Sequence, residues 1–146
     1  MIRRIVHPTD FSRASGAAFA KTLELARTNR AALLVLHVLA PVAPMVGDGY
    51  VSPATYDQIE ASSRAWAQKK LDALLARAKK TGVRTTGLLL EGTTHEQILR
   101  VAKSKRADLL VLGTHGRTGL AKFFLGSVAG RVAASASTPV LTVRGT

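Results

Sequence analysis

The feature that most constrains the fold is a regular alternation of short apolar runs with amphipathic segments. The apolar runs predict strands over 2–7, 31–39, 83–90, 109–112 and 138–143. Runs that are apolar throughout suit strands covered on both faces of a sheet. Five such strands alternating with four helical segments predict a doubly wound α/β fold, an open parallel sheet with helices on both faces. The length of 146 residues suits a single domain spanning 1–146.

Capping residues and periodicity predict where the helices begin. Ser12 is a suitable N-cap for the first helix, and a capping box opens the second, which is expected over 55–80. Trp66 falls on the apolar side of that second helix and is predicted to lie in the core. A third helix follows the threonine pair at 93–94, and a fourth is expected with Ser127 as its N-cap.

Four glycines fill the segment between the strand at 109–112 and the helix near Ser127. They lie at positions 113, 116, 119 and 126. Glycine lets a ligand approach the backbone closely, and a helix N-terminus offers unpaired N–H groups with a partial positive charge. Together these parts predict a pocket for an anion, with phosphate as the expected anion.

The spacing of these glycines differs from two common phosphate-binding motifs. Neither the Walker A pattern nor the G-x-G-x-x-G dinucleotide pattern occurs in the chain. The order Gly113-x-x-Gly116, nine residues, then Gly126-Ser127 resembles the ATP-binding signature of the universal stress protein family. The first strand also ends in Pro-Thr-Asp at 8–10, as the family's first strand does. The resemblance covers essentially the whole chain and implies the strand order 3-2-1-4-5.

The resemblance also implies roles for individual residues. The glycines and Ser127 would hold a triphosphate, Asp10 would contact the nucleoside or a divalent metal, and Val38 would offer backbone groups to adenine. The nucleotide-binding residues implied in this way are Pro8, Thr9, Asp10, Val38, Gly113, His115, Gly116, Arg117, Gly126, Ser127 and Val128. His7 and Phe11 depart from the family pattern, which often has an aliphatic residue and a glycine there.

Three further side chains have more than one interpretation. Arg117 could neutralise phosphate charge or point into water. His115 could act as a general acid or base, but no carboxylate nearby in sequence would orient it. His37 interrupts the second apolar strand and is expected to be a core or strand-end histidine with a local hydrogen bond.

These features favour a protein that binds ATP, or ADP or AMP, with Mg²⁺ as a companion that Asp10 could help to hold. The first hypothesis is a stress-response sensor or adaptor with at most slow ATP hydrolysis, since no second carboxylate for a metal or water is evident. One alternative is a genuine ATPase or nucleotidyl-transfer enzyme that uses Asp10 and His115. Another is a basic protein associated with nucleic acid.

The formal net charge of +12 at pH 7 comes from 21 basic and 9 acidic residues. A basic surface would attract ATP, RNA and anionic lipid alike. Aromatic residues make up only 5% of the chain, too few for the stacking platform of a single-strand binder. The sequence therefore favours solvated surface charge over a dedicated nucleic-acid site.

Compartment and assembly follow from what the chain contains. It has no cysteine, no apolar run long enough for a membrane span and no signal-peptide pattern at its start, which indicates a cytoplasmic protein. In many members of the family the last strand pairs across a two-fold axis. A homodimer through Val140 to Val143 is therefore expected, with a plain edge strand as the alternative.

Overall fold

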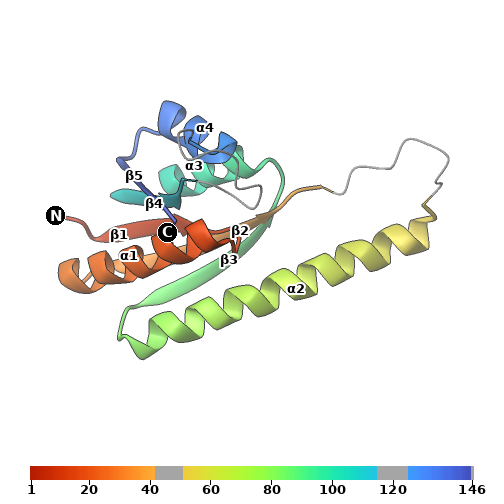
Figure 1. The fold of residues 1–146 in the computed structure, drawn as a ribbon, viewed down its shortest axis with the longest axis horizontal. Coiled ribbons are helices and arrows are strands. Elements are labelled where there is room, and N and C mark those ends of the chain that lie inside the picture. Colours follow the sequence, from red (N-terminus) through yellow and green to blue (C-terminus); the bar gives the residue numbers. More distant parts are fainter. Residues whose placement is uncertain (42–50, 115–124, 146) are drawn as a thin grey trace.

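The structure, a computed structural model, describes residues 1–41, 51–114 and 125–145. In this part of the chain, parallel strands form one sheet in the order β3-β2-β1-β4-β5 (Figure 1). The strands are β1 (Arg4–Pro8), β2 (Ala32–Leu39), β3 (Thr85–Glu91), β4 (Leu109–Gly113) and β5 (Val140–Val143). The parallel arrangement and the strand order are both confirmed.

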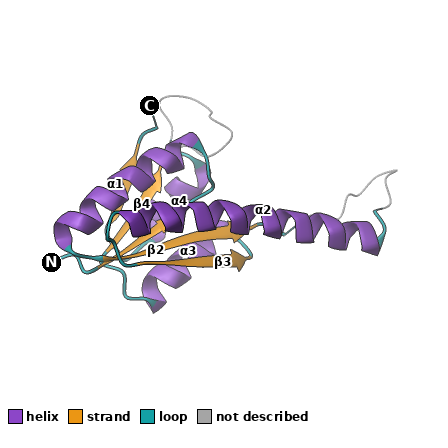
Figure 2. Cartoon of the chain, turned by 90° about the horizontal axis from the view of Figure 1, so that it is seen from below, coloured by secondary structure: helices purple, strands orange, loops and turns teal. Residues whose placement is uncertain are grey.

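Helices cover both faces of the sheet, as predicted. The described residues form α1 (Arg13–Asn29), α2 (Pro53–Lys80), α3 (Thr94–Ser104) and α4 (Ser127–Ser135). Helices α1 and α2 pack on one face, and α3 and α4 pack on the other (Figures 1 and 2). None of these helices combines the length and the apolar character that crossing a bilayer requires.

The sheet divides the hydrophobic core into two layers because successive side chains of a strand point to opposite faces. In β1, Ile5 is buried in the layer under α1 and α2, and Val6 in the layer under α3 and α4. Val111 and Leu110 of β4 are divided between the two layers in the same way. This double burial explains why the strands are apolar throughout and do not alternate with polar residues.

The structure shifts two predicted helix starts. Ser52 caps α2, where its Oγ accepts a hydrogen bond from the Thr55 N–H at 3.2 Å. Pro53 then occupies the first turn, where a missing N–H costs little. At α4 the N-cap is Gly126, and Ser127, the expected cap, is the first helical residue. The glycine therefore leaves this helix without a capping side chain.

Strand ends also move by small amounts. The predicted strand starts at 83 and 138 shift to Thr85 and Val140, and β1 runs to Pro8, which pairs with Leu36. The strand predicted over 2–7 stops before this proline. Pro8 is tolerated as the last residue of β1 because the next ladder hydrogen bond is donated by Thr9, to the Leu36 carbonyl at 2.8 Å.

Helix α2 extends beyond the sheet that it covers (Figures 1 and 2). Its buried residues, Ala67, Leu71 and Ala78, all belong to its C-terminal half. Trp66 is 42% exposed, so the prediction that it lies in the core is wrong. It sits where the helix leaves the sheet, and its ring meets that of Phe11 edge-on with the centroids 5.5 Å apart.

Candidate functional site

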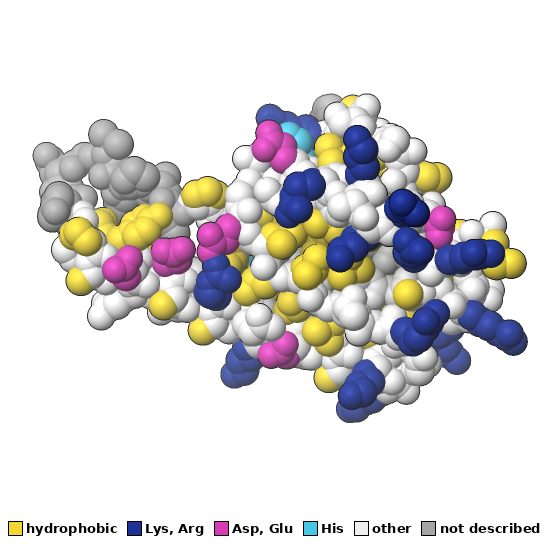
Figure 3. Space-filling view, turned by 180° about the vertical axis from the view of Figure 1, so that it is seen from behind, with side chains coloured by type: hydrophobic (Ala, Val, Ile, Leu, Met, Phe, Trp, Pro, Cys, Tyr) yellow, Lys and Arg dark blue, Asp and Glu magenta, His cyan; other side chains and the backbone are white. Residues whose placement is uncertain are grey.

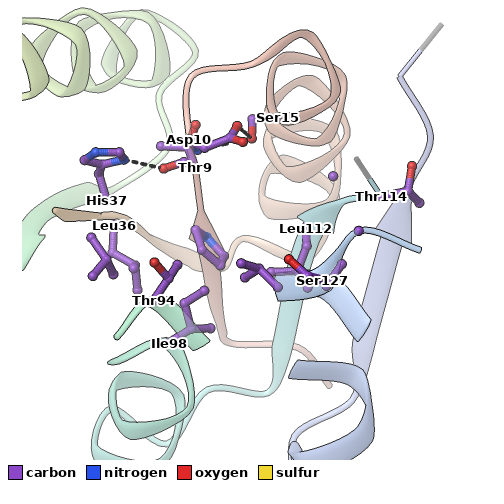
Figure 4. Close-up of a pocket in the computed structure, with 16 residues that line it drawn as sticks. Thr9, Asp10, Ser15, Leu36, His37, Thr94, Ile98, Leu112, Thr114 and Ser127 are labelled. Atoms are coloured by element: carbon purple, nitrogen blue, oxygen red, sulfur yellow. Dashed lines mark hydrogen bonds between the residues drawn. The ribbon is translucent and has the colours of Figure 1, made fainter. Parts of the chain in front are cut away.

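A cavity of about 220 Å³ opens where β1, β2 and β4 end (Figure 4). The chain passes from β1 outward to β2 and β3, and then returns to place β4 on the other side of β1. The strand order therefore reverses between β1 and β4. In open α/β sheets, ligands bind beyond the carboxyl ends of the strands at such a reversal. The topology alone thus marks this cavity as the candidate site.

The N-terminus of α4 forms one wall of the cavity. Gly126, Ser127, Val128 and Ala129 all line it. Because Gly126 at the N-cap has no side chain, no hydrogen bond from a capping side chain satisfies the first N–H groups of the helix. The helix dipole adds a partial positive charge at the same place. This wall can bind an anion, and the hydroxyl of Ser127 is a further donor.

The carboxylate of Asp10 is fixed on another wall, against the first turn of α1. Its Oδ1 accepts hydrogen bonds from the Ser15 hydroxyl at 2.6 Å and from the Ser12 N–H at 2.9 Å. Burial alone would raise the pKa of Asp10, but hydrogen bonds from Ser12 and Ser15 outweigh it and hold that pKa below its ordinary value. At neutral pH the cavity therefore has an oriented negative charge from Asp10 as well as the positive end of α4.

Thr9 ties the end of β1 to β2. Its carbonyl oxygen accepts a hydrogen bond from Nδ1 of His37 at 2.7 Å, drawn as a dashed line in Figure 4. Because a carbonyl can only accept, Nδ1 of His37 carries the proton. His37 thus lies near the end of β2 and has a hydrogen bond, as predicted, but the partner lies 28 residues away in the sequence and is not local. His37 also lines the cavity, which its sequence context did not indicate.

Phe11 adopts a left-handed backbone conformation, with φ at 63°. Glycine adopts this conformation without cost, whereas a phenylalanine is strained there. Its ring packs in return against His37, with the centroids 4.6 Å apart, and against Trp66. The other departure from the family pattern, His7, is fully buried beside Phe19 in the layer under α1.

Gly113 lines the cavity, yet packing already accounts for its missing side chain. A Cβ at this position would lie 2.7 Å from the carbonyl carbon of Ala14 and 2.9 Å from the backbone nitrogen of Ser15. The end of β4 can approach the first turn of α1 this closely only with a glycine. The residue therefore shapes the cavity by letting two backbones meet.

The structure brings most of the predicted site residues together. The residues that line the cavity as expected are Pro8, Thr9, Asp10, Val38, Gly113, Gly126, Ser127 and Val128. The remaining predicted residues, His115, Gly116 and Arg117, lie outside the described residues. Segments from β1, β2, β4 and α4 that are far apart in the sequence thus meet at one cavity.

Sequence reasoning missed several lining residues. They are Ser15, Leu36, His37, Thr94, Ile98, Leu112, Thr114 and Ala129. Thr94 could have been found, because it follows the carboxyl end of β3 and so belongs to the same rim of the sheet. The apolar members carry no signal of their own, since a core position and a cavity wall have the same residue type.

A larger open hollow of about 730 Å³ adjoins the cavity. The two share Asp10, His37 and Val38 as lining residues. Trp66 and Glu60 of α2 line the side of the hollow away from the sheet. A ligand too long for the cavity could therefore continue past Val38 into the hollow.

The described residues contain no cluster of three or more His, Asp or Glu side chains that could hold a metal ion. Asp10 is the one carboxylate among the described residues that line the cavity. Mg²⁺ commonly takes one or two carboxylates from the protein and the rest of its ligands from phosphates and water. Asp10 therefore fits Mg²⁺ as a partner of a phosphate-bearing ligand.

Comparison with known proteins decides the family. The model of the universal stress protein family matches residues 1–144. The chain belongs to the universal stress protein family. Universal stress protein MJ0531 of Methanocaldococcus jannaschii is 34% identical to it over 144 residues, which cover 99% of this chain and 83% of that protein. A universal stress protein of Thermus aquaticus is 35% identical over 145 residues, covering 99% of this chain and all of that protein.

Solved structures of universal stress proteins share the fold. The structure of MJ0577 from Methanocaldococcus jannaschii matches with a TM-score of 0.85 at 22% identity, over 100% of this chain and 98% of that one. A universal stress protein in complex with cAMP matches with a TM-score of 0.74 at 25% identity, over 99% and 98%. A family member from Arabidopsis thaliana with AMP bound matches with a TM-score of 0.72 at 24% identity, over 99% and 92%.

Proposed function

We propose that this universal stress protein binds an adenine nucleotide, ATP in the first place, in the cavity at the ends of β1, β2 and β4. The main support is the wall that Gly126 and Ser127 make at the N-terminus of α4, at the reversal of strand order. A phosphate is the anion that such a wall fits best. Family members in complex with cAMP and with AMP support the same class of ligand.

In this proposal the phosphates lie against α4 and the base lies toward β2. Ser127 would donate to a phosphate oxygen, and the backbone of Val38 would face the base at the junction of the cavity and the hollow. Ligand sites usually measure about 300 Å³ or more, so a whole nucleotide would extend from the smaller cavity into the adjoining hollow. His115, Gly116 and Arg117 would complete the phosphate site.

Asp10 would hold a Mg²⁺ ion together with the phosphates, and the ion would supply neutralisation of phosphate charge. Hydrolysis also needs a group that positions the attacking water. Asp10 is the single carboxylate lining the described cavity, and its Oδ1 is already occupied by Ser12 and Ser15. We therefore propose that any hydrolysis is slow.

A protein that holds ATP without consuming it quickly can act as a cytoplasmic sensor or adaptor. The nucleotide would bridge the first turns of α1 and α4, which lie on opposite faces of the sheet. Binding to the folded state alone also stabilises it, in proportion to the logarithm of the ligand concentration. The stability of the folded protein, and the binding of any partner that recognises the nucleotide-bound form, would then depend on the nucleotide concentration.

The test is calorimetric titration of ATP with Mg²⁺ into protein stripped of nucleotide, with ADP, AMP and cAMP titrated in parallel. Gly126→Leu should abolish binding, because a branched side chain at the N-cap of α4 would fill the place of the phosphates. Gly16→Leu is the matched control, since a Cβ at Gly16 meets no atom within 4 Å. Binding that is equal in both variants would contradict the proposed site.

The enzyme alternative is tested by Asp10→Asn. The amide preserves the shape of the carboxylate but removes its charge. If the chain is a genuine ATPase, phosphate release by the wild type should be fast, and Asp10→Asn should stop turnover while ATP still binds. Slow release in the wild type that Asp10→Asn leaves unchanged would support the sensor or adaptor.

A further inference from the structure

The edge of the sheet opposite the cavity collects positive charge. Strands β1 to β4 all begin there, and α1, α2 and α3 all end there (Figure 1). This edge is here called the amino edge. Its exposed basic residues are Arg3, Arg4, Arg30, Arg84, Lys105 and Arg106. The last turns of the three helices add further arginines and lysines. Residues spread over a hundred positions of sequence are thus brought together by the topology.

Negative charge at this edge is scarce. In the described segments 1–4, 27–32, 79–85 and 103–109, Asp108 is the one carboxylate. Its Oδ2 already accepts hydrogen bonds from the N–H groups of Arg3 and Arg4, both at 2.8 Å. Figure 3, in which the amino edge lies to the right, shows lysine and arginine side chains concentrated on that side. Acidic side chains are scattered over the same view, and several of them lie along the protruding helix. The face drawn there is therefore polarised, not uniformly basic.

Two of these arginines occupy positions that favour glycine. Arg30 has φ at 54° and Arg106 has φ at 51°, and each comes just after a helix. At the corresponding place after α2 the chain has a glycine, Gly82, with φ at 78°. The N–H of Arg30 donates to the Arg27 carbonyl at 3.2 Å and that of Arg106 to the Lys103 carbonyl at 3.1 Å, so the backbone closes both helices as a glycine would. A side chain in this conformation costs about 1 kcal/mol or more. The backbone is therefore strained at two arginines, Arg30 and Arg106, on the same edge of the sheet.

The helix dipole does not account for the whole pattern. Cations in the last turn of a helix are stabilised by the dipole, which explains those at the ends of α1, α2 and α3. Arg3, Arg4 and Arg84 lie outside the helices, at or before the starts of strands. Glycine at 30 and 106 would close the helices at lower cost. Arg4 has a role within the fold, since its guanidinium donates a hydrogen bond to the Lys105 carbonyl at 2.9 Å. Neither the helix dipole nor helix closure explains Arg3, Arg30, Arg84 and Arg106, and an external anion would explain arginine at these four places.

The amino edge also has a hollow of suitable shape. A depression of about 400 Å³ is lined by Arg27, Arg30 and Arg84, and no carboxylate is among its described lining residues. Thr81 contributes to the floor between the ends of α1 and α2. Arginine presents a planar fork of donors that matches two phosphate oxygens at once. A projecting phosphate fits this hollow.

We propose that the amino edge binds the phosphate backbone of double-stranded nucleic acid, without reading its sequence. The extended row of arginines matches a repeating phosphate and not a single anion. The described aromatic residues, Phe11, Phe19, Tyr56 and Trp66, lie elsewhere, so no stacking platform for single strands is present on this edge. Of the described large apolar residues that are exposed, Met1 alone adjoins the edge, which is too little to enter a lipid layer.

The experiment measures binding of a fluorescent duplex of about 20 base pairs by anisotropy, at salt concentrations between about 50 and 200 mM. The variant is Arg30→Gly with Arg106→Gly. It should weaken binding by about tenfold or more and lower the slope of log K against log salt by about 2, since each lost phosphate contact removes about one unit. Thermal unfolding should show equal or higher stability, because glycine relieves the strain at both positions.

The matched control is Lys69→Gln with Lys70→Gln, which removes the same charge from exposed positions in the middle of α2. It should change the affinity by less than about threefold. Arg84→Gln, which involves no left-handed backbone, should weaken binding as well. Equal losses in the control and the arginine variants would overturn the proposal in favour of net-charge attraction. So would failure to bind the duplex, or tighter binding to phosphatidylglycerol vesicles than to the duplex.

Discussion

A single missing methyl group sets how closely β4 approaches α1. At Gly113 a Cβ would lie 2.7 Å from the carbonyl carbon of Ala14, and backbone atoms of a helix cannot move aside easily. Gly113→Ala should therefore lower the free energy of unfolding by about 1 to 3 kcal/mol, the usual cost of overpacking. Urea denaturation of the wild type and the variant measures this difference in the free energy of unfolding. Gly16→Ala, where a Cβ meets no atom within 4 Å, should be neutral or stabilising, and an equal effect of both changes would contradict the packing account.

His7 should make the fold sensitive to acid. Burial lowers its pKa from 6.5 to about 4, although the hydrogen bond to the Val111 carbonyl raises it. The unfolded chain therefore binds a proton at higher pH than the folded protein does. The contribution of neutral His7 to the free energy of unfolding is fully present above about pH 6.5. It falls by about 3 kcal/mol as the pH drops toward 4. Urea unfolding at a series of pH values measures the slope.

The control for this prediction is His7→Asn. The amide can donate to the Val111 carbonyl in place of Nδ1, but it does not titrate. The variant should be less stable at neutral pH because it is smaller than the buried imidazole. Its stability should change less between pH 6.5 and 4 than that of the wild type. Identical pH profiles for the two proteins would show that His7 is not the responsible group.

The sequence could predict the charged and glycine residues of the candidate site, because strand ends and helix starts fix their place. Asp10 and Ser127 each follow a recognisable boundary. His37 could not be placed, since its role depends on the Thr9 carbonyl 28 residues away. Ser15 likewise joins the site through Asp10, and one side chain alone does not reveal such a contact. Contacts between elements are what the sequence does not show.

Among the elements, α2 combines two different halves. Ala67, Leu71 and Ala78 anchor its C-terminal half on the sheet, whereas no residue of 53–66 is buried and the helix runs on past the sheet. Local opening costs less where fewer apolar contacts are lost. Amide hydrogens of 57–65 should therefore exchange at least about tenfold faster than those of 68–78, as measured by hydrogen exchange with mass spectrometry. Uniform protection along α2 would contradict this and would indicate that another surface covers its N-terminal half.

The same helix shows why periodicity predicts elements better than their surroundings. The apolar positions of α2 correctly indicated a helix and its inward face. They also suggested that Trp66 is buried, because the pattern does not show where the sheet stops. The start at Ser52 was missed for a related reason, since Ser52 and Thr55 both have capping side chains and only the fold selects one. The strand order, by contrast, was implied by the family resemblance and is confirmed.

At the scale of the molecule, the parallel sheet separates two kinds of surface. Its carboxyl edge carries the cavity with Asp10 and the N-terminus of α4, and its amino edge carries the arginine row. The separation follows from the topology, because every right-handed crossover brings the chain back to the same edge. A nucleotide and a polyanion could then bind at the same time. Their sites would communicate only through the strands and helices between them.

The outer edge of the sheet should join two copies of the chain. Strand β5 lies at the end of the strand order. The Val143 carbonyl accepts from the Thr114 N–H and the Pro139 carbonyl from the Leu110 N–H, so the alternate residue Thr142 turns its backbone groups outward. We propose that β5 pairs with β5 of a second copy. Sedimentation velocity should then show a dimer for the wild type and a monomer for Thr142→Pro, which removes an outward donor.

Thr142→Val is the control that separates pairing from the side chain. It keeps the N–H and suits a strand, so it should remain dimeric. Proline at 142 should leave the ladder to β4 intact, because that ladder uses Pro139 and Val143, and circular dichroism should confirm a folded monomer. A folded Thr142→Pro dimer would exclude β5 as the interface, and a monomeric wild type would exclude the dimer. The positive charge of the amino edge should keep the amino edges of two copies apart. Pairing along β5, at the end of the strand order, does not require the two amino edges to meet.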